Sequence, residues 1–307
     1  MGKHVVVGAG QVGAHLAEEL AGAGHEVVVV TRSGSGPAGE RIERVAADAG
    51  DGPRLARITE GADALYNCVN MAYHRWPQDW PPVADALLAA AEHNGAGLVI
   101  LGNLYGYGPV DGPITEDLPL ASAGSKGRVR AKMWADALAA HEAGRLRATE
   151  VRASDFFGPG MSKDSVFGYI APILDGKPVR VPAPVDHPHS FTYIPDVARA
   201  LAAAGTGERA WGRAWHVPTL PAVTIRELVE RLAAAAGAPA PRVSAIPHIA
   251  MRAAGLFVPM VRELEETRYQ FDRPFILDSS AFESVFGLTP TPLEAQLKET
   301  VAWLRAR

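Results

Sequence analysis

The sequence contains almost no cysteine and no long apolar run. Its 307 residues include one cysteine, Cys68, which excludes an internal disulfide and a cysteine-rich metal site. Cysteine use of this kind is typical of a reducing compartment, so we expect a cytoplasmic protein. No apolar stretch reaches the roughly 18 residues that a membrane helix needs, and no basic segment followed by an apolar one opens the chain. We therefore expect neither export nor a membrane span.

A strong charge of one sign is also missing. The formal net charge is -4, and the basic residues are scattered along the chain. Because clustered basic residues bind nucleic acids and anionic membranes, we expect neither as a partner. The chain is rich in apolar residues instead: 48% of its residues are hydrophobic and 21% are charged, so it has a large core in one large domain or two smaller ones.

Short β-branched runs alternate with segments of helical spacing in the first two thirds of the chain. We expect strands at 4–7, 26–30, 64–69, 98–101 and 146–152, and helices at 14–23, 83–93 and 194–204. This alternation predicts an α/β fold, a Rossmann doubly wound parallel sheet with helices on both faces.

The composition changes after residue 156. Residues 157–189 are rich in Gly, Pro and His, and two helical segments, 225–236 and 292–305, follow between Pro-containing stretches. This change predicts a smaller C-terminal, substrate-binding lobe over the carboxyl edge of the sheet. We expect the Rossmann domain to comprise 1–155 and 190–212, and the lobe to comprise 156–189 and 213–307.

The strongest chemical signal is a glycine-rich turn. It directly follows an apolar strand and opens an amphipathic helix, which is the context of a dinucleotide-binding turn. Gly8 allows the tight turn, Gly10 lets the backbone approach a pyrophosphate, and Gly13 allows close packing of the helix on the strand. We expect the dinucleotide to contact Gly8, Gly10, Gln11, Val12 and Gly13 at the N-terminus of this helix.

The residues after the second strand favour NADP(H) as the cofactor. An NAD site has an acidic residue at this point, whereas here the strand is followed by Arg32 and Ser33. A guanidinium can donate two charge-assisted hydrogen bonds to a 2′-phosphate. Asp48, after the third strand, is placed to accept from the adenine amine. The alternatives are a solvated surface arginine at 32 and an exposed loop carboxylate at 48.

Several segments carry a resemblance to a known family. They are the glycine turn, Phe156-Phe157-Gly158-Pro159-Gly160 after a strand ending in Arg152, the run from His189 to Ala198, and Leu104-Tyr105-Gly106 followed by Glu116-Asp117-Leu118-Pro119. On these residues nearly the whole chain resembles the extended and atypical branches of the short-chain dehydrogenase/reductase superfamily, the NAD-dependent epimerase/dehydratases. The extended members usually space the turn as Gly-x-x-Gly-x-x-Gly, so the spacing here indicates an atypical subgroup.

The family's usual catalytic residues are replaced in this sequence. The resemblance implies a Tyr acid/base, a Lys four residues later, and a Ser or Thr on the fifth strand. A Gly and an Ala of the helix match the family's helix pattern. Aligned on these two residues, Lys126 falls at the Tyr position, Arg130 at the Lys position and Leu101 at the Ser position. A second register puts Lys132 at the Lys position and Arg128 at the Tyr position, but it loses the Gly match.

In the first register, Arg130 and Lys126 are the expected catalytic pair. We expect Arg130 to hydrogen-bond the nicotinamide ribose, because a guanidinium exchanges no proton near neutral pH. Lys126 is expected to face the reacting carbon and to exchange a proton if burial and the neighbouring guanidinium favour its neutral amine. Otherwise both are solvated helix cations, and the proton comes from Tyr105 or Tyr107 on the loop after the fifth strand, from Lys132, or from water.

Further residues are expected to line the site. We expect Asn70, Asn103 and Phe156 to contact the cofactor, and Tyr73, His74, Tyr105, Phe157 and His189 to contact the substrate. The family's sugar-nucleotide members hold a diphosphate in the C-terminal lobe, for which Arg180, Arg252, Arg262 and Arg268 are candidates. The histidines lack the spacing of metal ligands, so we expect no metal.

These residues favour an NADP(H)-dependent oxidoreductase. It is expected to reduce a carbonyl-like group, or to epimerise a centre, on a small molecule, with an active site that lacks the usual Tyr. The alternative is a dinucleotide-binding sensor, or a non-redox enzyme, that has lost hydride transfer. A homodimer is the assembly we consider, and the sequence does not specify the substrate.

Overall fold

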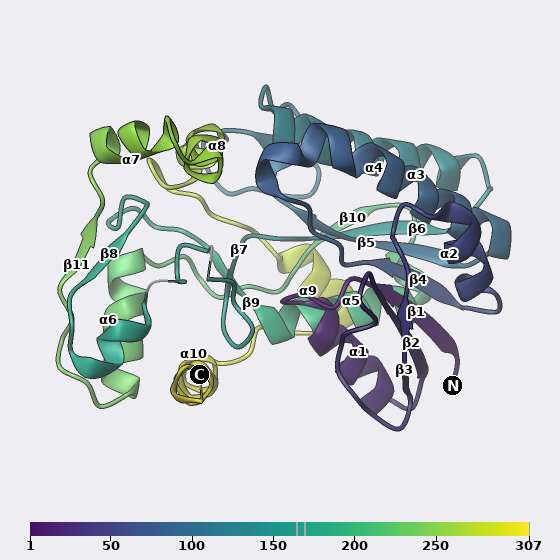
Figure 1. Cartoon of the computed structure of the whole chain (residues 1–307), viewed down its shortest axis with the longest axis horizontal. Helices are drawn as coiled ribbons and strands as arrows, with labels where there is room; N and C mark the ends of the chain where they lie inside the picture. Colours follow the sequence, from purple (N-terminus) through teal and green to yellow (C-terminus); the bar gives the residue numbers. More distant parts are fainter. Residues whose placement is uncertain (164, 169, 307) are drawn as a thin grey trace.

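The computed structural model describes residues 1–163, 165–168 and 170–306. Figure 1 shows a sheet covered by helices on both sides, with a smaller lobe beside it. The sheet has seven parallel strands, namely β1 (Lys3–Val7), β2 (Glu26–Thr31), β3 (Ile42–Ala46), β4 (Ala64–Asn67), β5 (Gly97–Asn103), β6 (Ala148–Ala153) and β10 (Ala214–His216). Their order across the sheet is β10-β6-β5-β4-β1-β2-β3, so the expected Rossmann doubly wound fold is confirmed.

Two helical layers cover the sheet. Helices α1 (Gly13–Gly22) and α5 (Ile194–Thr206) cover one face, and α2 (Gly52–Thr59), α3 (Trp76–Asn94) and α4 (Ser125–Glu142) cover the other. Successive residues of a strand point to opposite faces, so Val6 packs in the first layer and its neighbours Val5 and Val7 pack in the second. Helix α3 begins before the expected residue 83, because Pro77, Pro81 and Pro82 hide the helical pattern of its first turns.

The smaller lobe holds most of the elements that the sequence pattern did not reveal. It contains the paired strands β8 (Val179–Val181) and β11 (Val243–Ala245), the short helix η3 (Ala171–Asp175), and helices α6 (Ile225–Ala235), α7 (His248–Gly255) and α8 (Pro259–Thr267). Strands β7 (Asp155–Phe157) and β9 (Phe191–Tyr193) pair with each other, α9 (Ser280–Phe286) packs on β10, and α10 (Leu293–Arg305) packs on α6. The expected domain boundary at residue 212 falls just before β10, which belongs to the large sheet. No helix among the described residues is long and apolar enough to cross a membrane.

At two positions of the turn after β1, glycine is the only residue that fits. Gly8 adopts a φ of +98°, and a Cβ there would lie 2.6 Å from the carbonyl oxygen of Cys68 on the neighbouring strand end. A Cβ at Gly13 would lie 1.8 Å from the carbonyl oxygen of Gly8. The chain therefore passes so closely between β1, β4 and α1 that both positions exclude a side chain.

Helix α8 is fixed to the N-terminus of α4. The N-cap residue of α4, Gly124, has no side chain that satisfies the free backbone N–H groups of the first turn. Glu266 of α8 accepts instead from the backbone N–H of Lys126 at 2.7 Å and from the hydroxyl of Ser125 at 2.7 Å. A carboxylate is favourable at a helix N-terminus, where the helix dipole is positive.

The side chain of Lys126 completes this contact, which we call the α4–α8 clamp (Ser125, Lys126, Glu263 and Glu266). Its Nζ donates to Glu263 at 2.6 Å and to Glu266 at 3.1 Å, and the side chain is only 1% exposed. Burial acts to raise the pKa of Glu266, but hydrogen bonds from Ser125 and Lys126 outweigh it and hold that pKa below its usual value. The clamp therefore contains a buried ammonium held between two carboxylates.

Removing the ammonium should destabilise the protein. Lys126→Met leaves two partly buried carboxylates side by side without a counter-charge. We expect the free energy of unfolding to fall by about 2 kcal/mol, less than for a fully buried ion pair because both carboxylates keep some solvent. Urea unfolding of the variant measures this change.

The matched control is Lys132→Met on the same helix. Lys132 pairs with Asp136 on the surface, where its side chain is 73% exposed, so its removal should leave the unfolding midpoint unchanged. Equal unfolding curves for the two variants would contradict a stabilising clamp.

Candidate functional site

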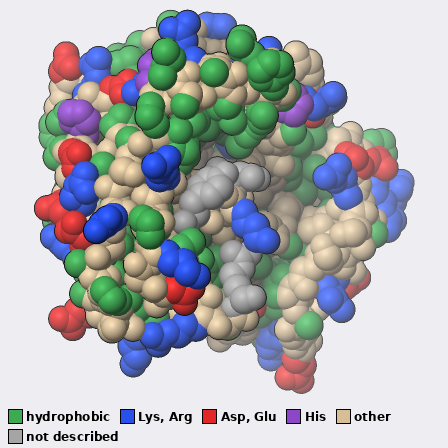
Figure 2. Space-filling model, turned by 60° about the vertical axis from the view of Figure 1, so that its left-hand side comes forward, with side chains coloured by type: hydrophobic (Ala, Val, Ile, Leu, Met, Phe, Trp, Pro, Cys, Tyr) green, Lys and Arg blue, Asp and Glu red, His purple; other side chains and the backbone are tan. Residues whose placement is uncertain are grey.

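A cavity of about 2050 Å³ lies between the carboxyl edge of the sheet and the smaller lobe. The turns that follow β1, β2, β4, β5 and β6 form its floor and sides, and α7 and α8 form its roof. Figure 2 shows apolar side chains gathered over this roof, where Ile249, Leu256 and Phe257 are exposed, and Lys and Arg side chains around the central part of the same face. Ligands of open α/β sheets bind at this edge, so the cavity is the candidate site.

The glycine turn forms one end of the cavity. Gly8, Gly10, Gln11 and Val12 line it, and the direction that a side chain at Gly10 would take has no atom within 4 Å. Gly13 instead packs under Gly8. The turn is held from the other lobe, because the side-chain oxygen of Gln11 accepts from the backbone N–H of Ser162 at 2.7 Å. The turn thus presents open backbone to the cavity, as a bound phosphate requires.

Arg32 and Asp48 lie at the outer end of this part of the cavity. Both line it and both are exposed. No carboxylate of the described residues forms an ion pair with Arg32, so its guanidinium is available to an anion. Asp48 uses one oxygen to accept from the backbone N–H of Gly50 at 2.7 Å. Ser33 lies outside the described lining, and its hydroxyl donates to that of Ser35 at 2.8 Å.

Arg130 lines the cavity from α4, as the first register expects. Its guanidinium carbon lies 4.8 Å and 4.5 Å from the ring centroids of Trp76 and Trp80, and its NH1 donates to the carbonyl oxygen of Leu101 at 3.1 Å. Its buried Nε has no partner among the described residues. Stacking on the two indoles fixes the cation without an ion-paired carboxylate among the described residues and leaves its Nε–H unused.

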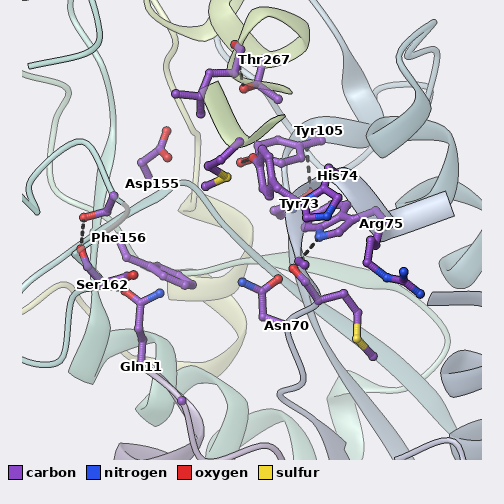
Figure 3. A pocket seen from close by; sticks show the side chains of 18 of the residues that line it. Gln11, Asn70, Tyr73, His74, Arg75, Tyr105, Asp155, Phe156, Ser162 and Thr267 are labelled. Atoms are coloured by element: carbon purple, nitrogen blue, oxygen red, sulfur yellow. Dashed lines mark hydrogen bonds between the residues drawn. The ribbon is translucent and has the colours of Figure 1, made fainter. Parts of the chain in front are cut away.

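Two tyrosines form the wall next to Arg130. Tyr73, on the short helix η1 (Tyr73–Arg75), and Tyr105, on η2 (Tyr105–Tyr107), share a short hydrogen bond between their hydroxyls. Figure 3 shows both on one side of the pocket, facing Asp155 and Phe156 on the other. Burial raises the pKa of Tyr105 well above its ordinary value and also raises that of Tyr73. Both hydroxyls therefore stay protonated at ordinary pH, and because one donates to the other, one hydroxyl proton is left for a bound group.

Lys126 lies elsewhere than expected. Its Nζ belongs to the α4–α8 clamp, and Lys126 is not among the described residues that line the cavity. The two carboxylates stabilise the charged ammonium, which is the opposite of the neutral amine that proton exchange requires. The ammonium also lies 5.1 Å from the ring centroid of Tyr73, so it supports the tyrosine wall from behind.

The other expected proton donors lie outside the cavity too. Lys132 is on the exposed side of α4, paired with Asp136. The hydroxyl of Tyr107 accepts from Arg152 at 2.6 Å and lies 2.8 Å from Nε2 of His216, in a buried network behind the wall. Among the proton donors expected from the sequence, Tyr105 is thus the one that lines the cavity.

Two of the expected substrate contacts are buried instead. Phe157 is 1% exposed, because its ring packs edge-on against Phe167 in the core. His189 is also 1% exposed and lies behind Asp155, with 2.9 Å between its Nε2 and the Asp155 carboxylate. Sequence analysis missed Asp155, which lines the cavity directly after β6. Its place after a strand of the parallel sheet was the signal that could have identified it.

The remaining expected contacts lie around the cavity. Asn70, Asn103, Phe156, Tyr73 and His74 all line it. So do Arg252, Arg262 and Arg268 from the roof, whereas Arg180, on β8, is outside the described lining. Within the described residues no group of His, Cys, Asp and Glu side chains has the arrangement of a metal site.

Solved structures similar to this chain share its whole fold. The protein MoeE5 in complex with UDP-glucuronic acid and NAD superposes with a TM-score of 0.80 and 23% identity, over 99% of each chain. The dTDP-glucose 4,6-dehydratase DesIV from Streptomyces venezuelae, with NAD and TYD bound, gives 0.78 and 23%, over 99% of this chain and 97% of that one. The UDP-glucuronic acid 4-epimerase from Bacillus cereus, in complex with UDP-glucuronic acid and NAD, gives 0.78 and 18%, over 99% of each. At these identities the likeness shows the fold alone.

A match to a family model shows that the sequence, as well as the fold, is related to known proteins. A sequence search of the curated proteins finds no match. The family model described as "NAD dependent epimerase/dehydratase family" matches residues 4–215, which include the glycine turn, both tyrosines, Arg130 and Asp155. The resemblance drawn from the sequence is therefore confirmed, and the chain belongs to the NAD dependent epimerase/dehydratase family.

Proposed function

We propose that this chain is an NADP(H)-dependent oxidoreductase that acts on a hydroxyl or carbonyl carbon of a sugar nucleotide. The observation that carries the proposal is the continuous cavity, which joins the open glycine turn and the exposed Arg32 to a wall of protonated tyrosine hydroxyls. One end suits a dinucleotide, and the middle suits a reacting oxygen.

The residues present fit a nicotinamide dinucleotide. The empty space at Gly10 and the N-terminus of α1 suit its pyrophosphate, and Asp48 suits the adenosine. Arg32 suits a 2′-phosphate, because its guanidinium is exposed at the cavity with no carboxylate of the described residues beside it. Arg130 has an unused Nε–H donor for the nicotinamide ribose. When bound, the nicotinamide supplies or accepts a hydride.

Tyr105 takes the place at the reacting oxygen that the sequence suggested for Lys126. Tyr105 lines the cavity and its hydroxyl remains protonated, so with Tyr73 as the donor in their shared bond the Tyr105 hydroxyl donates a hydrogen bond to the oxygen of a bound carbonyl. A donor held in place before the reaction stabilises the negative charge that develops on this oxygen. Tyr73 fixes the orientation of that donor through the shared hydrogen bond.

The roof of the cavity suits an anionic substrate. Arg252, Arg262 and Arg268 line this part, and a guanidinium binds a phosphate with two parallel hydrogen bonds. The similar solved structures hold UDP-glucuronic acid, or NAD with TYD, which supports a sugar nucleotide as the substrate class. The direct test is incubation with UDP-glucose, UDP-glucuronic acid and dTDP-glucose, with NADP⁺ or NAD⁺, followed by chromatography of the products. Unchanged sugar nucleotides in all mixtures would exclude this substrate class.

Gly10→Val should abolish dinucleotide binding without unfolding the protein. The added side chain enters open space in the cavity, where the pyrophosphate is expected, so the thermal midpoint should stay close to that of the parent. Gly13→Val is the contrasting variant, because its Cβ would strike the Gly8 carbonyl and should prevent folding. Calorimetric titration with NADPH and a thermal melt separate the two effects. A folded Gly10→Val protein that still binds NADPH would mean that the dinucleotide lies elsewhere.

Arg32 should make NADPH bind more tightly than NADH. Arg32→Asp replaces a cation by an anion next to the 2′-phosphate, so we expect NADPH affinity to fall at least about tenfold, or about 1.4 kcal/mol. NADH affinity should fall less, because NADH has no 2′-phosphate. Calorimetry on both proteins measures the four constants. If the parent binds both cofactors equally, the assignment of Arg32 is wrong.

Tyr105→Phe should lower kcat by about 100-fold, the usual effect of removing one donor from a developing oxyanion. Dinucleotide affinity should be unchanged, because Tyr105 is placed at the substrate. Tyr73→Phe serves as the comparison, since it removes only the partner of that donor and should lower kcat less. Steady-state kinetics with the active sugar nucleotide distinguish them. A larger loss in Tyr73→Phe would assign the reacting oxygen to Tyr73 instead.

A further inference from the structure

We propose that Asp155 and His189 share one proton, and that Asp155 exchanges protons with a hydroxyl group bound in the cavity. This inference rests on the proposed function, because it assigns the proton acceptor of the same site. The tyrosine wall cannot fill that role, since burial keeps both hydroxyls protonated. The carboxylate facing them across the pocket is Asp155 (Figure 3).

The ring of His189 is held in one orientation. Its backbone exchanges two hydrogen bonds with Val223, at 3.0 Å and 3.1 Å. Its ring is parallel to that of Phe271, with 4.6 Å between centroids, and is also stacked on Phe191 and Phe275. With the side chain 1% exposed, this stack excludes water from both faces of the imidazole.

The hydrogen bond at Nδ1 determines where the ring carries its protons. Nδ1 lies 3.0 Å from the carbonyl oxygen of Gln270, which can only accept, so Nδ1 carries a proton. If the ring were neutral, Nε2 would then present a lone pair to the Asp155 carboxylate at 2.9 Å. Two lone pairs at that distance repel each other. The pair therefore holds one proton, as imidazolium with carboxylate or imidazole with carboxylic acid, although Nε2 is not aligned for a hydrogen bond to the Asp155 oxygen.

Asp155 connects this proton to the cavity. Its side chain is 28% exposed and lines the pocket, whereas His189 lies behind it. The contact with Nε2 is close but poorly aligned, and no other described group donates a hydrogen bond to this carboxylate oxygen. Ser154 offers its hydroxyl to Nε2 only at 3.5 Å. Asp155 is therefore the member of the pair that meets the cavity.

None of the described groups that face Asp155 and His189 competes with them as proton acceptor. Tyr73, Tyr105 and Tyr269 are the titratable groups coupled to the charge of Asp155. Burial is the main cause that raises the pKa of each tyrosine, and the negative charge of Asp155 raises it further. The three phenylalanines and the Gln270 carbonyl cover the rest of His189. The faces of the aromatic rings stabilise an imidazolium, which offsets part of its loss of water.

The proton step balances in both directions. In oxidation, the substrate O–H bond breaks and its proton goes to Asp155, so that the pair becomes an imidazolium and a carboxylic acid. The O–H electron pair forms the second bond of the carbonyl, and the C–H hydrogen leaves with its electrons as hydride to an oxidised nicotinamide dinucleotide. In reduction, the same proton returns to the oxygen while Tyr105 holds that oxygen by a hydrogen bond.

The protonation state of His189 can be measured without any substrate. Nitrogen NMR of the histidine-labelled protein, with His189→Gln to assign the signal, should show protons on both ring nitrogens in the parent at neutral pH, or a proton exchanging between Nε2 and Asp155. Asp155→Asn should remove this proton and leave Nε2 unprotonated. A signal that does not respond to Asp155→Asn would overturn the shared proton.

The second arm measures catalysis with UDP-glucuronic acid, UDP-glucose and dTDP-glucose as probes. Asp155→Asn and His189→Gln should each lower kcat by about 100-fold, with unchanged NADPH affinity. The exposed neighbours give matched controls, because Asp186→Asn and His187→Gln change the same residue types outside the described lining and should keep full kcat. Full kcat in Asp155→Asn would overturn the proposal. If no probe reacts with the parent protein, the proposed function fails while the NMR arm still decides the shared proton.

Discussion

The cavity depends on the α4–α8 clamp. The ammonium of Lys126 is withdrawn from water, and such a group is tolerated only when counter-charges stand beside it. Glu263 and Glu266 provide them, and Glu266 also caps α4 at the backbone of Lys126. The same ammonium lies behind the ring of Tyr73, whose hydroxyl is bonded to Tyr105. One charge therefore fixes both the roof of the cavity and its tyrosine wall.

The parallel sheet explains why residues far apart in the chain meet in this cavity. All seven strands run the same way, so the segments after β1, β2, β4, β5 and β6 emerge at one edge. Together they bring four kinds of group: open backbone at Gly10, a cation at Arg32, hydroxyls at Tyr73 and Tyr105, and a carboxylate at Asp155. These side chains are free to differ because the strands, not the loops, carry the packing of the core.

The sequence alone was enough to predict features that depend on residues close together in the chain. The βαβ alternation, the glycine turn and the position of Arg130 on α4 all follow from local spacing, and the structure has each of them. The environment of Lys126 depends on Glu263 and Glu266, about 140 positions away, in a helix that the pattern did not reveal. Phe157 was misplaced because three-residue β7 is too short for its alternation to show which side faces the core.

The contrast between Lys126 and Asp155 shows how burial separates a structural charge from a reactive one. Both lie near the tyrosines, and each has an oppositely charged or chargeable partner. Lys126 has two well-placed acceptors and no opening to the cavity, so moving its proton would break three favourable contacts. Asp155 has one poorly aligned partner and is open to the pocket, so gaining a proton from the pocket breaks no aligned hydrogen bond. A group exchanges protons where its interactions are incomplete, and on that condition the proposed proton acceptor is the carboxylate after β6 rather than Lys126.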